Sequence, residues 1–168
     1  HTIDQYLEKI EKLKKRNSSI KFSSDFIIGY PGETEDDFEK TILLMKEVMF
    51  INSYSFIFSP RPGTPAANMK EVNTKIAKER LFIFQSLANE IKKNYRKELI
   101  NTNAEVLFEN KVKGENEYFG RDKYFNSVIV KSNDNLTGKI KNVRINHCNH
   151  NTLFGKIILD DNKQECAA

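Results

Sequence analysis

The chain has 168 residues, of which 39% are hydrophobic, and a formal net charge of +4 at pH 7. This length suits one large or two small domains, and the hydrophobic content suffices for a packed core. No apolar run is long enough to span a membrane, and the mild positive charge permits nucleic-acid binding without requiring it. Cys148 and Cys166 stand far apart and outside any metal-ligand spacing, so we expect no disulfide framework, no zinc site and a reducing, cytoplasmic setting.

The first half of the chain predicts alternating helices and strands. Apolar residues recur at helical spacing over 4–16, which indicates an amphipathic helix. The run over about 20–29 suits a strand covered on both faces, because it is rich in large apolar residues: Ile20, Phe22, Phe26, Ile27 and Ile28. A helix over about 35–49 and a strand over Ser53–Phe58 follow. This order predicts neighbouring parallel strands.

The turn after the first strand is the most informative stretch. Pro31-Gly32 interrupts the strand, and Thr34 with Asp37 matches the capping box that starts a helix. Strand, glycine turn and helix start together place free backbone N–H groups at the carboxyl end of a sheet, where α/β folds bind ligands.

A second loop follows the second strand, over residues 59–67. Its three prolines and one glycine exclude a helix or a strand ladder, so we expect a shaped loop. Arg61 within it is compatible with anion binding and equally with a solvent-exposed linker. A long helix then runs to about residue 99, capped by Asn73 or Thr74. Its terminal basic residues indicate a solvated face favoured by the helix dipole: Lys92, Lys93, Arg96 and Lys97.

The composition changes near residue 101, where helical periodicity ends. Short β-rich runs follow, separated by polar turns: Ala104–Glu109, Tyr118–Arg121, Ser127–Lys131, Gly138–Ile145 and Thr152–Leu159. Such spacing predicts a small β-barrel. We therefore divide the chain into an α/β domain over 1–101, a barrel over 102–160 and a polar tail over 161–168.

The barrel carries basic residues interleaved with aromatic ones, which is typical of nucleic-acid binding. The aromatic residues Tyr118, Phe119, Tyr124 and Phe125 also fit a core. Our candidate RNA contacts are Lys113, Arg121, Lys123, Lys131 and Arg144. His147 and His150 flank Cys148 within the stretch 146–151, where we favour a polar turn over a metal site.

Two long motifs resemble the radical S-adenosylmethionine methylthiotransferases. Asp25-Phe-Ile-Ile-Gly-Tyr-Pro-Gly-Glu-Thr34, with Glu35-Asp-Asp-Phe38, is similar to their fifth-strand motif, and Ser55-Phe-Ile-Phe-Ser-Pro-Arg-Pro-Gly-Thr-Pro-Ala-Ala67 to their sixth. Glu79-Arg80-Leu81 is similar to the helix that follows. The β-rich end, with Phe119-Gly-Arg121 and Leu153-Phe-Gly155, resembles their RNA-binding TRAM domain, although the usual glycine before it is absent from Leu99–Thr102.

The resemblance implies a fold and a function. The fold is α/β followed by all-β: the last part of a partial (β/α)6 radical barrel, then a TRAM or OB-like barrel. The implied activity is methylthiolation at C2 of an isopentenylated adenosine beside the anticodon of tRNA. Other branches of the family act on threonylcarbamoyl-adenosine in tRNA or on a ribosomal protein, and a non-catalytic RNA-binding module is an alternative of another class.

The resemblance also implies cofactors and partners. They are S-adenosylmethionine, two [4Fe–4S] clusters, the tRNA anticodon stem-loop and an electron donor, with no membrane and a monomeric state. Cluster ligation needs cysteines in motifs that this chain lacks, and a start at His1 is not a natural initiation site, so we expect the ligands upstream in a longer protein. We expect no catalytic residue in the chain itself.

The resemblance assigns five residues to the S-adenosylmethionine site. Ile28 and Gly29 would form a wall against the adenosine, and Asp25 would accept from a hydroxyl or ammonium group, or merely organise the barrel interior. Glu33 would fix the turn or contact the cofactor, and Arg61 would meet a carboxylate or phosphate.

Overall fold

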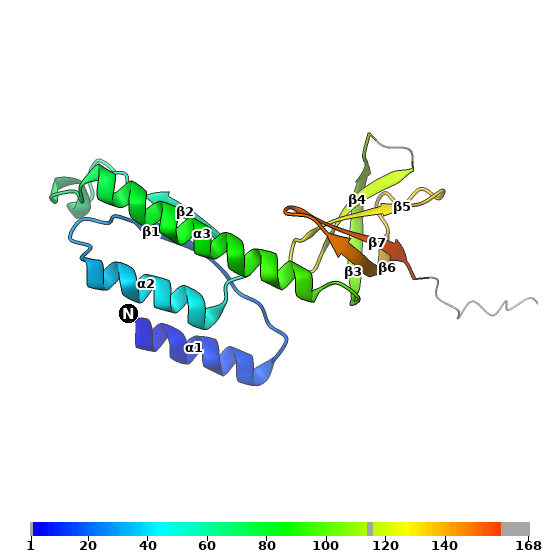
Figure 1. Cartoon of the computed structure of the whole chain (residues 1–168), viewed down its shortest axis with the longest axis horizontal. Helices are drawn as coiled ribbons and strands as arrows, with labels where there is room; N and C mark the ends of the chain where they lie inside the picture. The colour runs from blue at the N-terminus through cyan, green and yellow to red at the C-terminus, as the bar shows by residue number, and fades with distance from the viewer. Residues whose placement is uncertain (1, 114–115, 159–168) are drawn as a thin grey trace, which may run out of the picture. The chain divides into compact units, whose positions relative to one another are not determined.

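In a computed structural model, residues 2–113 and 116–158 are described, and they form two compact units (Figure 1). One unit runs to Lys92 and the other starts at Lys93, within a single long helix. The elements are α1 (Ile3–Arg16), β1 (Ser23–Ile28), α2 (Glu35–Val48), β2 (Asn52–Ile57), the 3-10 helix η1 (Pro65–Asn68), α3 (Thr74–Glu98), β3 (Asn103–Lys111), β4 (Glu117–Asp122), β5 (Ser127–Lys131), β6 (Ile140–Cys148) and β7 (Thr152–Ile157). The domain limits at 101 and 160 stay a prediction, and Leu159 and the polar tail lie outside the described residues.

The predicted order of the α/β unit is confirmed. Strands β1 and β2 pair in parallel, with Ser23 opposite Asn52 and Ile28 opposite Ile57. Helix α2 starts at the predicted capping box: Thr34 Oγ1 accepts from the Asp37 N–H, and Asp37 Oδ2 accepts from the Thr34 N–H. The capping box stabilises the first turn of the helix that follows the carboxyl end of β1.

One hydrophobic core holds the three helices on one face of this two-stranded sheet. Its members include Ile10 of α1, Met45 of α2, Phe84 of α3 and Ile28 of β1. The rings of Phe26 and Phe84 lie 4.7 Å apart between sheet and helix. Burial of these large side chains is what holds the helices against the sheet.

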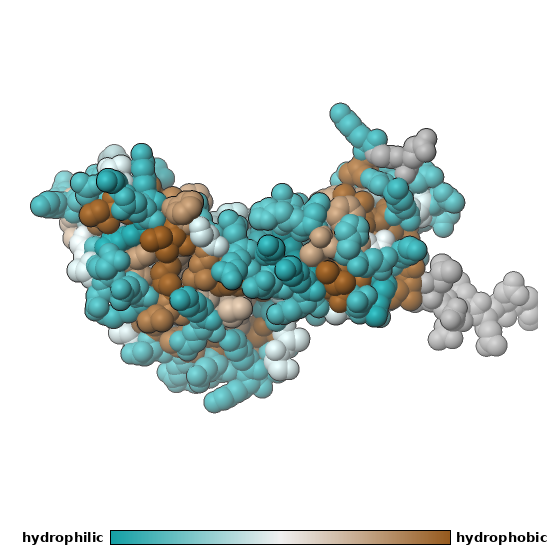
Figure 2. Space-filling view, viewed as in Figure 1, coloured by the Kyte–Doolittle hydropathy of each residue, from teal (hydrophilic) through white to brown (hydrophobic). Residues whose placement is uncertain are grey.

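The other face of the sheet is uncovered. Ile27 is 58% exposed, and Tyr54 and Phe56, which lie on the same face, are each 59% exposed. The prediction of a strand covered on both faces was therefore wrong. Alternation along β1 sends Phe26 and Ile28 towards the helices and Asp25 and Ile27 away from them, and the described residues place no layer over the second side. Figure 2 shows hydrophobic side chains at the surface of this unit among mostly hydrophilic ones.

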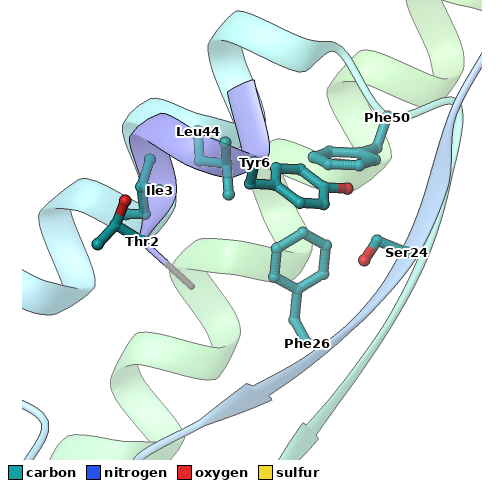
Figure 3. Close-up of a pocket in the computed structure, with 7 residues that line it drawn as sticks. All are labelled: Thr2, Ile3, Tyr6, Ser24, Phe26, Leu44 and Phe50. Atoms are coloured by element: carbon teal, nitrogen blue, oxygen red, sulfur yellow. The ribbon is translucent and has the colours of Figure 1, made fainter. Parts of the chain in front are cut away.

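A small pocket of about 210 Å³ lies at the edge of the helical core. Figure 3 shows the rings of Tyr6, Phe26 and Phe50 converging on it, with Ser24 at one side. Phe26 and Phe50 meet edge to face at 5.4 Å. The pocket is thus bounded by core aromatic residues on the helix-covered side of the sheet.

The second unit is a closed five-stranded barrel, as predicted. Its strands pair in the order β3-β4-β5-β7-β6, and β6 returns to β3. The interior is filled by alternate side chains of all five strands, among them Val106, Tyr118, Val130, Ile145 and Leu153.

No helix in the described part of the chain is long and apolar enough to cross a membrane.

Strand β6 extends further than the sequence predicted. The polar turn expected over 146–151 was wrong for its first half, because β6 continues to Cys148. A bulge between Ile145 and His147 shifts the pairing with β7 by one residue. Asn146 and His147 consequently both face outward, while Cys148 packs against the core.

The C-terminal turn of α3 packs into the barrel unit and corrects the prediction for Arg96. Instead of lying on a solvated face, Arg96 is 6% exposed, and its Nη1 donates to the carbonyl of His150. Burial lowers its pKa. Tyr95, one residue earlier, is 6% exposed, and its hydroxyl accepts from Asn126 Nδ2 at 3.5 Å. The two side chains anchor the end of the helix to the barrel.

Candidate functional sites

The turn after β1 is organised by Glu33. The Gly29 N–H donates to Glu33 Oε2 at 3.0 Å, and the Glu33 N–H donates to the Tyr30 carbonyl at 2.9 Å. Gly29 has a φ of 73°, and a Cβ there would lie 2.8 Å from the Cβ of Ala77 on α3. Glycine is required at this position by both its left-handed backbone and the close approach of α3.

Arg80 of α3 binds the residues of this turn through its guanidinium group. Its Nη1 donates to Glu33 Oε1 at 2.8 Å and to the Glu33 carbonyl at 3.2 Å, and its Nη2 donates to Glu35 Oε2 at 2.8 Å. The guanidinium is 5.5 Å from the centre of the Phe38 ring. Although burial favours the neutral form, the hydrogen bonds that Arg80 donates to Glu35 and Glu33 raise its pKa overall. The Nε atom has no hydrogen-bond partner among the described residues.

Sequence reasoning quoted Arg80 but gave it no role. The available signal was its position: Ala77, Arg80 and Phe84 share one face of α3 at helical spacing, and all three are buried. Apolar spacing along this helix also suggests Ile76 as a buried residue, but Ile76 is 43% exposed. A charged residue in a buried helical register needs a partner, and Glu33 supplies it.

The structure separates the five residues assigned to the cofactor site. It joins Gly29 to Glu33, whereas no hydrogen bond or ion pair among the described residues links either to Asp25 or Arg61. Asp25 is exposed on the uncovered sheet face, in register with Tyr54. Ile28 is 1% exposed, so its side chain belongs to the helical core and cannot line that face.

Arg61 lies in an exposed loop that the sequence predicted only in part. Its carbonyl accepts from Thr64 Oγ1 at 2.8 Å, and its guanidinium has no partner within the described part of the chain. The loop contains one turn of 3-10 helix from Pro65, which the predicted absence of helix missed. A proline fits the first position of such a turn because its missing N–H would be unpaired there in any case.

A row of apolar and aromatic side chains crosses the outside of the barrel. Phe119 of β4 is in register with Ile129 of β5, Ile129 with Phe154 of β7, and Phe154 with His147 of β6. The rings of His147 and Phe154 stack 4.4 Å apart and 6° from parallel. We call these four residues the outer row.

Cations border the outer row on both sides. Arg121 lies 5.3 Å from the centre of the Phe119 ring and pairs with Glu109 at 3.1 Å. Lys131 lies two residues beyond Ile129 and is 3.6 Å from Glu117. Because β4 and β5 are antiparallel, Arg121 and Lys131 fall on opposite sides of the row. Flat rings between cations can stack bases and pair with phosphates.

The other candidate RNA contacts lie away from the outer row. Lys113 and Lys123 are exposed in loops, and Lys123 Nζ is 5.1 Å from the centre of the Tyr124 ring. Arg144 is exposed on β6, where its Nη1 donates to Asn103 Oδ1 at 3.1 Å.

The aromatic residues of the barrel divide between its interior and its surface. Tyr118 is a core residue at 6% exposure, while Phe125 is 75% exposed with a φ of 61°. The sequence alone did not indicate that Ile129, Phe154 and His147 belong to the outer row. The β-alternation of each strand was visible, but the pairing that aligns them was not.

Comparison with known proteins finds relatives that match nearly all of the chain. A protein of Pelagibacter ubique (strain HTCC1062) named tRNA-2-methylthio-N(6)-dimethylallyladenosine synthase is 52% identical over 166 residues, which is 98% of this chain and 37% of that protein. Proteins of the same name from Wolbachia pipientis subsp. Culex pipiens (strain wPip) and Vesicomyosocius okutanii subsp. Calyptogena okutanii (strain HA) are 42% and 40% identical, over 92% of the chain in each case. These matches cover 36% and 35% of the two proteins. No family model matches the chain.

The chain thus spans little more than a third of the relatives that it matches, in their C-terminal part. The identity extends through both compact units. Along nearly all of its own length the chain is therefore homologous to the family of the tRNA-2-methylthio-N(6)-dimethylallyladenosine synthases.

Proposed function

We propose that the chain serves an enzyme that methylthiolates C2 of an isopentenylated adenosine beside the anticodon of tRNA. The observation that carries this is 52% identity, across 98% of the chain, to a protein whose name states that activity on tRNA. The barrel would hold the tRNA anticodon stem-loop, and the α/β unit would form part of the reaction chamber. A cytoplasmic location, a monomeric state and an external electron donor belong to the same proposal.

The α/β unit fits a place in the wall of a partial (β/α)6 radical barrel. Parallel strands with helices on one face and an apolar, uncovered second face are what such a wall requires, since further strands would close over that second face. Ile27 and Phe56 present flat apolar surface there, and Asp25 presents a hydrogen-bond acceptor. These groups fit the adenosyl part of S-adenosylmethionine. In this proposal Ile27 adds side-chain surface to the wall that the resemblance assigns to Ile28 and Gly29.

Within this proposal the residues of the turn hold the backbone of the site in place and take no part in the reaction itself. S-adenosylmethionine, if bound there, would supply the radical chemistry of the reaction. Glu33 and Arg80 fix the turn so that the Gly29 backbone closes the carboxyl end of β1. The residues present do not fit an iron–sulfur cluster: Cys148 is the one cysteine within 2–113 and 116–158, and a cluster needs several thiolates.

The activity is tested by mass spectrometry of tRNA nucleosides from a strain lacking the gene. We expect the 2-methylthio form of isopentenyladenosine to disappear and the unmethylthiolated form to accumulate. Loss of the methylthio group from threonylcarbamoyl-adenosine would favour that alternative branch. An unchanged nucleoside profile would refute the proposal and favour a non-catalytic RNA-binding module.

The role of Arg61 is tested separately in the gene's full product. Arg61→Lys retains the charge but loses the planar fork that binds a carboxylate or phosphate in two places. We expect weaker S-adenosylmethionine binding and lower turnover. Arg61 has no contribution to the site if both are unchanged relative to a Lys70→Arg control, which alters an exposed cation of the same loop region.

A further inference from the structure

The His147 end of the outer row borders an open hollow of about 500 Å³ on the barrel surface. Strands β5, β7 and β6 form most of it and β4 contributes Glu117, and the rest of its lining includes Ile129, Lys131, Asn146, His147, Phe154 and Lys156. Its floor is apolar, because Ile129 and Phe154 are in register on neighbouring strands. Such a surface favours a flat, unsaturated ligand.

The bulge in β6 gives the hollow its shape. In a regular strand, residues 146 and 147 would point to opposite faces of the sheet. Here the extra residue turns both outward, which sets the imidazole of His147 parallel to the Phe154 ring and leaves the Asn146 amide at the rim. The Asn146 side chain makes no hydrogen bond within the described residues, so its amide can both donate and accept.

Two lysines and one carboxylate, that of Glu117, line the hollow, so its net charge is positive. Lys131 is 78% exposed and only loosely paired with Glu117, at 3.6 Å. Lys156 is exposed, and in the described part of the chain its Nζ has no carboxylate within ion-pair distance. A flat stacking surface with an amide and two cations at its edge matches the three parts of a nucleotide: base face, base edge and phosphate.

We propose that this hollow binds one unpaired nucleotide of RNA. The base continues the stack of His147 and Phe154, Asn146 meets its edge, and Lys131 and Lys156 pair with the adjoining phosphates. A base within a duplex cannot enter, since both of its faces are already covered by neighbouring bases. This inference rests on the proposed function, and it specifies that the barrel reads a single-stranded loop and not only the charge of a stem.

The test compares two RNAs with the purified chain by fluorescence anisotropy. One is a hairpin with an unpaired loop, and the other is a blunt duplex of the same stem sequence. Phe154→Leu keeps the hollow apolar but removes the flat ring, and Phe82→Leu makes the same change at an exposed position of the α/β unit. Circular dichroism checks that each variant is folded, and His147→Leu serves if Phe154→Leu is not.

We expect the chain to bind the hairpin more tightly than the duplex. Phe154→Leu should weaken hairpin binding about tenfold, the usual effect of losing one stacked base, and leave duplex binding unchanged. Phe82→Leu should alter neither. If Phe154→Leu leaves hairpin binding intact, or weakens both RNAs equally, the inference is overturned while RNA binding stands. If the chain binds neither RNA, the role of the barrel within the proposed function fails too.

Discussion

The link between Arg80 and Glu33 is the most consequential buried contact of the α/β unit, and its loss can be estimated. Arg80→Met keeps most of the apolar stem but removes three hydrogen bonds. Glu35 is 70% exposed, so its bond contributes at most about 0.5 kcal/mol. Glu33 is 11% exposed and would keep only the Gly29 N–H, so the loss there is about 3 kcal/mol.

Urea-induced unfolding followed by far-ultraviolet circular dichroism measures this difference, because the α-helices α1, α2 and α3 contribute to the signal. We expect Arg80→Met to lower the free energy of unfolding by about 3 kcal/mol and Glu35→Gln by about 0.5 kcal/mol. Lys78→Met, at an exposed position of the same helix, should be nearly neutral. Equal losses for Arg80→Met and Glu35→Gln would show that the buried carboxylate is not the main partner of Arg80 and would refute this reasoning.

Three further outcomes follow from the structure. Gly29→Ala should lower the free energy of unfolding by about 1–2 kcal/mol because of the positive φ, and further because the new Cβ overlaps Ala77. A second change, Ala77→Gly, should recover only the part due to the overlap. Equal stability of Gly29→Ala and the parent would contradict this. Burial raises the pKa of Tyr95 to about 12 from an ordinary value of 10.0, so its contribution to stability is complete below pH 10.0 and lost as the pH rises towards 12. Ultraviolet titration should show one late-ionising tyrosine that Tyr95→Phe removes. An unchanged late phase in Tyr95→Phe would exclude Tyr95 as its source. Arg121→Gln and Lys131→Gln should each reduce the slope of log affinity against log salt for single-stranded RNA by about 0.7, and an unaltered slope would mean that the residue contacts no phosphate.

Local signals predicted most of the fold. The capping box at Thr34 and Asp37 placed the start of α2, and short β-rich runs between polar turns placed the barrel strands, because each of these signals lies within a few residues of the chain. The uncovered face of β1 was not predictable in this way. Ile27 and Ile28 are both apolar, and only the position of the helices decides which of them is buried.

The candidate sites show the same division between local and distant information. Pro31-Gly32 predicted the turn, and the resemblance suggested that Glu33 fixes it, with which the hydrogen bond from the Gly29 N–H to Glu33 agrees. Arg80 is 47 residues from Glu33, so no local pattern joined them. The outer row likewise depends on the register of four strands, which side-chain alternation alone leaves undefined.

The bulge in β6 also has a consequence for how this surface can vary between related proteins. Deletion of Asn146 would remove the bulge and leave a regular strand, in which Ile145 and Cys148 still face the core and His147 still faces outward opposite Phe154. The rings of His147 and Phe154 would keep their register, but the hollow would lose the Asn146 amide at its rim although neither ring had been substituted. A change in length by one residue at this point therefore removes a polar group from the recognition surface, and relatives that differ there in length should differ in which base edges they bind.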